Sequence, residues 1–322
     1  MKIIGHEKQR ELLSKLVQTR EVPHAMLFNG DAGIGKKLVA LEFARTFYCE
    51  DYSKEQVTFK LGGCNECKSC RLFNDFAIPD FYFVECGDKE QVKTENIREL
   101  LYNLNLKNFS SKYKFIIFND AHLIREQSAN ILLKTLEEPK SDTYFILITS
   151  NFSKLPITIT SRCHMWHFST LTNDEILEIL KEKNLSLKSK NDIELLEGSL
   201  INLELILNNE NKTREFEEKI NLILKGDIYV LNLFASELAK NKNKDELKYD
   251  IHILRNIIRK KMTNETDLKL KSIFAITLEA LISCEYLIFD RYLNAESTLC
   301  NIFFNLLPTN KLNKSYSLPL LY

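Results

Sequence analysis

The sequence predicts an α/β fold, a doubly wound parallel sheet, followed by an all-helical C-terminal region. Three observations support this prediction. Short apolar runs alternate with amphipathic helical patterns in the first half of the chain, an order that is typical of parallel sheets. A glycine-rich loop joins the first apolar run to a helical pattern. After about residue 210 the periodicity is helical, and Gly226 is the only glycine.

The elements of the predicted sheet follow one another in a regular order. Apolar runs predict buried strands, and apolar residues at helical spacing predict the helices between them. In chain order we expect a strand at 25–29, a helix at 38–48, strands at 81–84 and 114–118, a helix at 125–138 and a strand at 144–149. A sheet of this kind has its ligand site at the carboxyl ends of its strands.

Composition and charge exclude several classes of protein. With 322 residues, 44% of them hydrophobic, the chain can bury a large core in two or three domains. Its 44 basic residues balance 44 acidic ones, so DNA binding by this chain alone is not favoured. No apolar run approaches the roughly 18 residues of a membrane span, and residues 1–6 lack the features of a signal peptide. We therefore expect a soluble, cytoplasmic protein without membrane attachment.

Residues 30–37 match the phosphate-binding loop G-x-x-x-x-G-K-[ST] except at the last position. In this motif, backbone N–H groups and the lysine hold the phosphates, so the candidate nucleotide-binding residues are Gly30, Gly33, Gly35 and Lys36. Lys37 stands where a serine or threonine hydroxyl holds Mg²⁺. The loop therefore indicates phosphate-binding ancestry and the loss of one metal ligand. Two interpretations stay open: the loop binds ATP or ADP without hydrolysis, or it is a vestige that no longer binds nucleotide.

A second departure from a hydrolysing site follows the strand at 114–118. An intact Walker B strand would end in Asp-Glu, in which the aspartate holds Mg²⁺ through water and the glutamate polarises the attacking water. Here the pair is Asn119-Asp120. Lys37 and Asn119 replace the two residues that would hold the same Mg²⁺ ion, so the sequence favours a relaxed requirement for Mg²⁺. The alternative is that Asp120 alone suffices and hydrolysis is merely slow.

The cysteines indicate a zinc site. Cys64, Cys67 and Cys70 have the C-x-x-C-x-x-C spacing, and Cys49 ends the helix after the phosphate loop. Four thiolates close a tetrahedral Zn²⁺ site, which is structural because it leaves no open position. Cys86 is the competing fourth ligand, although its place at the end of a strand favours a buried residue. An iron–sulfur cluster is disfavoured because the pattern does not continue to a fourth cysteine and a proline.

Two stretches of sequence carry a specific resemblance. ANILLKTLEEP at 129–139 and LPITITSRC at 155–163 closely resemble the clamp-loader branch of the AAA+ ATPases. Within that branch the chain is most similar to the delta-prime subunits of bacterial DNA polymerase III. The resemblance spans at least residues 3–205 and includes the stretches IIGHEKQRELL, PHAMLFNG and CNECKSC.

The resemblance implies roles for four residues. Ser161, Arg162 and Cys163 match a tripeptide whose arginine reaches the γ-phosphate in a neighbouring subunit, so Arg162 is implied to act in trans as an arginine finger. Motor subunits of the family also carry a sensor arginine in a Gly-Ser-x-Arg segment, and here Ile201 stands in its place. Delta-prime subunits resemble inactive AAA+ folds, and the resemblance implies such a stator here.

The domain organisation implied by the resemblance has three parts. Residues 1–167 would form the AAA+ nucleotide-binding-like domain with a zinc module at about 49–70. Residues 168–209 would form a small helical lid, and residues 210–322 a helical collar for oligomerisation.

The implied function is that of a clamp-loader subunit within the DNA polymerase holoenzyme, in a hetero-oligomer with the gamma/tau motor and delta subunits. The complex would load the sliding clamp onto primer-template DNA during replication, and this chain itself would lack ATPase and polymerase activity. Two alternatives remain open: an ATP-hydrolysing motor-type subunit, and a zinc-dependent adaptor that binds nucleic acid.

Overall fold

The structure is a computed structural model. It describes residues 3–53, 61–87, 93–105, 111–138, 142–187, 190–208, 211–240, 244–289 and 291–308. The chain divides into two compact units, one formed by residues 1–186 with 197–201 and the other by residues 187–196 with 202–322. The three-domain organisation, with boundaries at 167 and 209, stays a prediction.

The first unit contains a five-stranded sheet in which every described pair of strands is parallel, in the order β2-β3-β4-β1-β5. The chain order reverses around β1, as the doubly wound prediction requires. The four predicted strands are present, and β5 was not expected. The strands are β1 (Ala25–Asn29), β2 (Phe81–Glu85), β3 (Lys114–Asn119), β4 (Thr143–Thr149) and β5 (His164–His167).

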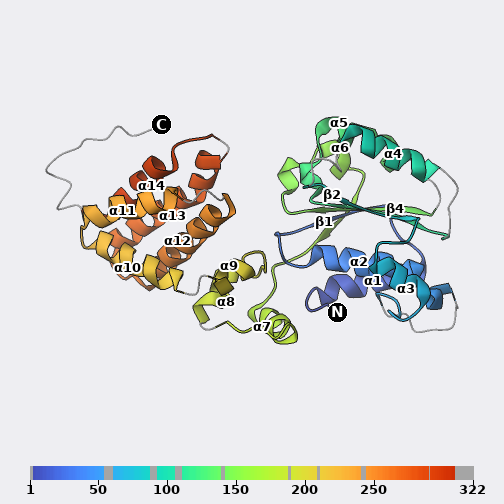
Figure 1. Cartoon of the computed structure of the whole chain (residues 1–322), viewed down its shortest axis with the longest axis horizontal. Coiled ribbons are helices and arrows are strands. Elements are labelled where there is room, and N and C mark those ends of the chain that lie inside the picture. Colours follow the sequence, from blue (N-terminus) through green and yellow to red (C-terminus); the bar gives the residue numbers. More distant parts are fainter. Residues whose placement is uncertain are drawn as a thin grey trace. The chain divides into compact units, whose positions relative to one another are not determined.

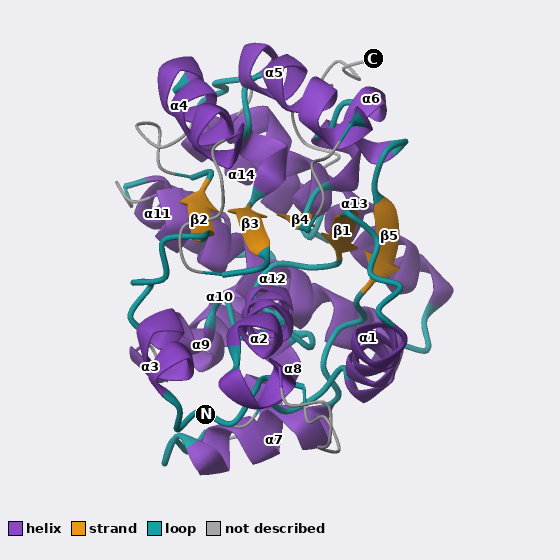
Figure 2. Cartoon of the chain, turned by 90° about the vertical axis from the view of Figure 1, so that its right-hand side faces the viewer, coloured by secondary structure: helices purple, strands orange, loops and turns teal. Residues whose placement is uncertain are grey.

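Helices cover both faces of this sheet. Figures 1 and 2 show α1, α2 and α3 on one face and α4, α5 and α6 on the other. Three short 3-10 turns, Glu50–Ser53, Ala121–Leu123 and Phe152–Lys154, lie between the elements. The helices of this unit are α1 (Glu7–Thr19), α2 (Lys36–Tyr48), α3 (Lys68–Asn74), α4 (Thr94–Asn105), α5 (Glu126–Glu137), α6 (Ile157–Thr160) and α7 (Asn173–Glu182).

Successive side chains of each strand point to opposite faces of the sheet, and a separate hydrophobic core lies on each face. On β1, Met26 and Phe28 belong to the core under α1 and α2, whereas Ala25 and Leu27 belong to the core under α4 and α5. Successive side chains of a strand point to opposite faces, so a strand buried on both faces is apolar throughout. These two cores fix the carboxyl ends of the strands at one edge, where the phosphate loop begins.

The second unit is helical in all the parts that the structure describes, as the sequence predicts. Its helices are α8 (Lys190–Leu196), α9 (Leu203–Asn208), α10 (Lys212–Leu224), α11 (Ile228–Ala239), α12 (Lys244–Asn264), α13 (Leu268–Phe289) and α14 (Ala295–Phe304).

One described helix, α13, is long and apolar enough to cross a membrane by length and composition. This finding corrects the expectation that no segment approaches a membrane span. Glu279 and Glu285 interrupt the apolar run, but an 18-residue stretch of the helix keeps a mean hydropathy of 1.7. Only 28% of that stretch is buried. One face of α13 packs inside the helical unit, because buried side chains recur along it at helical spacing, namely Phe274, Thr277, Leu281, Cys284 and Ile288.

Candidate functional site

The phosphate loop follows β1 and leads directly into α2. Gly33 has a φ of +73°, and a Cβ there would lie 2.6 Å from Ser199 Oγ. Gly30 has a φ of +156°, and a Cβ there would lie 2.3 Å from the Phe168 carbonyl oxygen. A side chain at either position would collide with a neighbouring segment, so both glycines are required by close approach as well as by conformation.

Lys36 is the buried cation of this loop, with 5% of the residue exposed. Its ammonium donates to the carbonyl oxygens of Gly30, at 2.6 Å, and of Asp31. Burial lowers the pKa of Lys36 to about 8, although the carboxylates of Asp120 and Asp31 act in the opposite direction. The lysine thus lies against the loop that its motif assigns to phosphate.

The backbone donors of the loop have no acceptor in the described part of the chain. Among the described residues, none accepts a hydrogen bond from the backbone N–H groups of residues 33–37. These groups lie at the N-terminus of α2, where the helix dipole also favours an anion. The donors and Lys36 therefore form a cradle that can accept phosphate oxygens.

A segment near the end of the first unit packs on this loop. Ser199 Oγ donates to the Ala32 carbonyl oxygen at 2.6 Å, and the Leu200 N–H donates to the Gly33 carbonyl oxygen at 3.1 Å. The structure places Ile201 next to this contact, with 61% of the residue exposed. An aliphatic side chain at this position supplies no positive charge to a phosphate.

Lys37 and Asn119 are brought together by a residue that the sequence interpretation missed. Lys37 Nζ lies 3.3 Å from Glu85 Oε2, and Asn119 Nδ2 donates to Glu85 Oε1 at 2.6 Å. Asn119 also donates to Asp120 Oδ2 at 3.2 Å. Glu85 ends β2 directly opposite Asn119 on β3. A carboxylate at the end of the neighbouring strand was the available signal, but the sequence does not reveal which strands are neighbours.

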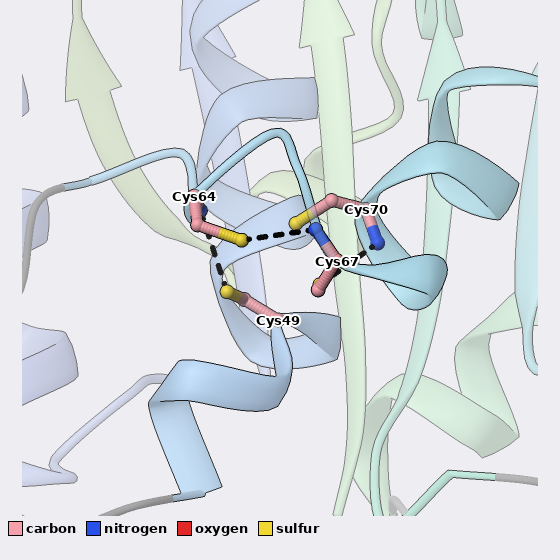
Figure 3. A group of neighbouring side chains, drawn as sticks. All are labelled: Cys49, Cys64, Cys67 and Cys70. Carbon is pink, nitrogen blue, oxygen red and sulfur yellow. Dashed lines mark hydrogen bonds between the residues drawn. The ribbon is translucent and has the colours of Figure 1, made fainter.

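The four predicted zinc ligands form one cluster. Figure 3 shows Cys49 at the end of α2, Cys64 and Cys67 on the following loop, and Cys70 on α3. Their sulfur atoms lie within 4.8 Å of one another. A tetrahedral Zn²⁺ site with Zn–S bonds of about 2.3 Å separates its sulfurs by about 3.8 Å. The cluster could therefore bind a metal such as zinc. Residues 54–60 of the predicted module lie outside the described residues.

Backbone donors around the cluster suit thiolate ligands. The N–H groups of Cys64, Cys67 and Cys70 point to the sulfurs of Cys49, Cys64 and Cys67 at 3.3 to 3.4 Å, as the dashed lines in Figure 3 mark. Donors from the backbone lower the pKa of Cys64, whereas burial raises the pKa values of Cys49 and Cys70. A metal would offset that burial because it binds the deprotonated sulfur.

Cys86 lies apart from this cluster. It is 2% exposed and belongs to the core under α4 and α5. Burial raises its pKa, as expected of an inert thiol in an apolar environment. Among the described residues, the geometry therefore favours Cys49 as the fourth ligand.

Arg162 lies just after α6, and its side chain is 33% exposed. Nε donates to Glu137 Oε1 at 2.8 Å, Nη2 donates to the same oxygen, and Nη1 donates to the Thr158 carbonyl oxygen at 2.7 Å. Ser161 Oγ accepts a further bond from Nη1 at 3.3 Å. Burial raises the pKa of the Cys163 thiol to about 12, which disfavours the reactive thiolate form.

Comparison with protein families is decisive for the first unit. The family model described as DNA polymerase III, delta subunit, matches residues 5–172. The matched region contains the phosphate loop, the cysteine cluster and Arg162. The chain belongs to this family.

Curated relatives of this delta-family chain are subunits of DNA polymerase III. It is 30% identical over 200 residues to the DNA polymerase III subunit gamma/tau of Mycoplasma pneumoniae, covering 62% of this chain and 28% of the relative. It is 32% identical over 180 residues to the gamma subunit of Buchnera aphidicola subsp. Schizaphis graminum, covering 56% of this chain and 47% of that one. The chain thus spans less than half the length of these relatives. The resemblance to the DNA polymerase III clamp-loader family is confirmed.

Among solved structures, this delta-family chain is similar to a gamma subunit-related protein from Thermotoga maritima. The identity is 18%, the coverage is 91% of this chain and 98% of the other, and the TM-score is 0.45.

Proposed function

We propose that this chain is a delta-prime-type subunit of the bacterial DNA polymerase III clamp loader, a stator that does not hydrolyse ATP and donates Arg162 in trans. Its partners are the gamma/tau motor subunits and the delta subunit, and the assembly loads the sliding clamp onto primer-template DNA in the cytoplasm. The observation that carries the proposal is the pairing of Lys37 and Asn119 with Glu85 at the edge where a hydrolysing site would hold Mg²⁺.

Metal-assisted charge neutralisation is central to phosphoryl transfer. At this edge Lys37 offers a cation and Asn119 a neutral amide, so neither is an anionic metal ligand. Ile201 supplies no charge from the lid. These three positions support a subunit whose own site does not catalyse hydrolysis, while the cradle of N–H groups and Lys36 supports retention of ATP or ADP.

The position of Arg162 supports a role in another subunit. Its side chain is 33% exposed, so a neighbouring subunit can reach it, and Glu137 on α5 and Thr158 on α6 hold the guanidinium in place. An arginine supplied in trans stabilises the charge of the transition state in nucleotide hydrolases.

We assign to the four-cysteine cluster a structural Zn²⁺ ion, which would tie the end of α2 to α3.

ATP turnover by the purified chain tests the proposal. We expect no hydrolysis above the rate of a Lys36→Ala variant, because neither metal-ligand position is intact. A rate that depends on Lys36 and on Mg²⁺ would instead identify a motor-type ATPase and would overturn the stator proposal. DNA affinity that is lost when the cysteines are replaced would favour the adaptor alternative.

Glu137 is expected to position the finger. Its carboxylate holds both Nε and Nη2 of Arg162, so Glu137→Gln keeps the size of the side chain but loosens the guanidinium. We expect kcat at the neighbouring motor site to fall roughly two- to tenfold, with KM unchanged, because only the orientation of the arginine changes.

The matched control for this prediction is Glu138→Gln, which removes the adjacent exposed charge. Steady-state ATP turnover of the reconstituted complex gives both constants. An effect confined to KM, or equal effects of the two variants, would show that Glu137 does not orient the finger.

A further inference from the structure

Glu85 joins the two positions at which this chain departs from a hydrolysing site. One of its oxygens faces the Lys37 ammonium at 3.3 Å, and the other accepts from the Asn119 amide at 2.6 Å. The ammonium also lies 4.5 Å from the centre of the Phe83 ring, which attracts a cation. The departures at Lys37 and Asn119 are therefore parts of a single interaction, which we call the Glu85 bridge.

The charges of the bridge depend on one another. An aspartate in place of Asn119 would set two carboxylates side by side at hydrogen-bond distance, which disfavours the ionised form of one of them. A threonine in place of Lys37 would remove the ammonium group that lies 3.3 Å from Glu85 Oε2. Because the Lys37 and Glu85 side chains are 45% and 34% exposed, their pairing contributes little to stability, and its importance is that it holds the Lys37 ammonium at the strand edge.

Magnesium does not fit this arrangement. Mg²⁺ binds carboxylates and water in near-ideal octahedral geometry, with phosphate oxygens completing the set. At the described edge, Glu85 is already engaged by a cation and an amide. Asp120 accepts a hydrogen bond from the Asn119 amide, and its carboxylate partly opposes the effect of burial, which lowers the pKa of Lys36. A divalent cation would meet two lysine ammonium groups and no uncommitted carboxylate of Glu85 or Asp120.

We infer that Lys37 supplies, as a fixed cation, the positive charge that Mg²⁺ supplies in hydrolysing relatives, so that this loop binds polyphosphate without a metal. The ligand class is a nucleoside diphosphate or triphosphate, or inorganic pyrophosphate, held by the N–H groups of residues 33–37 and by Lys36. This inference rests on the nucleotide-retaining loop of the proposed function, and it is independent of the role of Arg162.

Equilibrium titration of the full chain with a fluorescent ADP analogue tests the inference, once in EDTA and once in excess Mg²⁺. We expect the affinity in EDTA to equal or exceed that in Mg²⁺. Unlabelled ADP, ATP and pyrophosphate, added as competitors, then distinguish a nucleotide from a bare polyphosphate. Binding that requires Mg²⁺, or no binding in either buffer, would overturn the inference.

Two variants and a control separate the bridge from a general loss of charge. Lys37→Thr should weaken binding in EDTA by about tenfold, because a charge-assisted contact to phosphate is lost. Lys37→Thr combined with Asn119→Asp should bind more tightly in Mg²⁺ than in EDTA. Lys15→Thr, an exposed lysine on α1, should leave both affinities unchanged. If Lys37→Thr behaves like Lys15→Thr, Lys37 is not the substitute cation.

The same titration distinguishes the two proposals. Mg²⁺-dependent binding without ATP hydrolysis would overturn the substitute-cation inference and leave the stator proposal standing. Hydrolysis by the isolated chain would overturn the stator proposal.

Discussion

Replacing Arg162 with alanine is expected to lower ATP turnover at the motor site that receives it by about 10³–10⁵-fold, the typical contribution of an arginine finger. The physical reason is that the guanidinium neutralises charge that develops only in the transition state. The measurement is steady-state ATP hydrolysis by the reconstituted complex, in which the other motor sites are disabled by substitution of their own phosphate-loop lysines.

Two further variants make this result specific. Arg162→Lys keeps the charge but loses the planar fork of the guanidinium, so we expect most of the loss to persist. Arg214→Ala is the control: it removes an arginine of α10 whose side chain is 85% exposed, and it should leave turnover unchanged. Full turnover with Arg162→Ala, in a complex shown to be assembled, would remove this residue from catalysis.

Removal of the metal is expected to have the second-largest effect, this time on stability. Apparent binding free energies of structural Zn²⁺ reach about 10–16 kcal/mol in zinc-finger peptides, where the metal carries the whole fold. Here α2 is anchored independently in the core, so we expect Cys64→Ser to cost roughly 4 kcal/mol and to lower Tm by about 10 °C. Elemental analysis should find one zinc ion per wild-type chain and a reduced content in the variant.

Cys86→Ser is the informative control for the metal prediction. This residue is buried in the opposite core, so the substitution is expected to reduce stability while the chain keeps its zinc. Cys49→Ser should lose zinc as Cys64→Ser does. A full zinc content in Cys49→Ser together with loss of zinc in Cys86→Ser would reverse the assignment of the fourth ligand.

The sequence predicts the fold well where its signals are local. Each apolar strand flanked by helical periodicity was identified, because burial on both faces requires an uninterrupted apolar run. Strand β5 is not predicted because it has only four residues. Two of them are exposed histidines, so the strand contains no apolar run. It is a strand because β1 offers it a pairing edge, which is a tertiary effect.

In the candidate site, too, the residues that belong to local motifs are predicted from sequence, and those placed by tertiary packing are not. The phosphate loop and the cysteine spacing are short motifs, and the structure brings the four cysteines together as their spacing suggests. Glu85 and Glu137 could not be assigned from sequence, because each reaches its partner through the packing of separate elements. Their roles depend on strand register and on the approach of α5 to α6, which no local pattern encodes.

The register that sets Glu85 opposite Asn119 also limits how this chain can change. Restoring an aspartate at 119 alone would place it against the Glu85 carboxylate, and restoring a threonine at 37 alone would remove the Lys37 ammonium from Glu85. Each single reversion therefore alters the charge around Glu85 without completing a magnesium site. Recovery of hydrolysis requires changes at both positions, in addition to those at Asp120 and Ile201, and no single substitution achieves it.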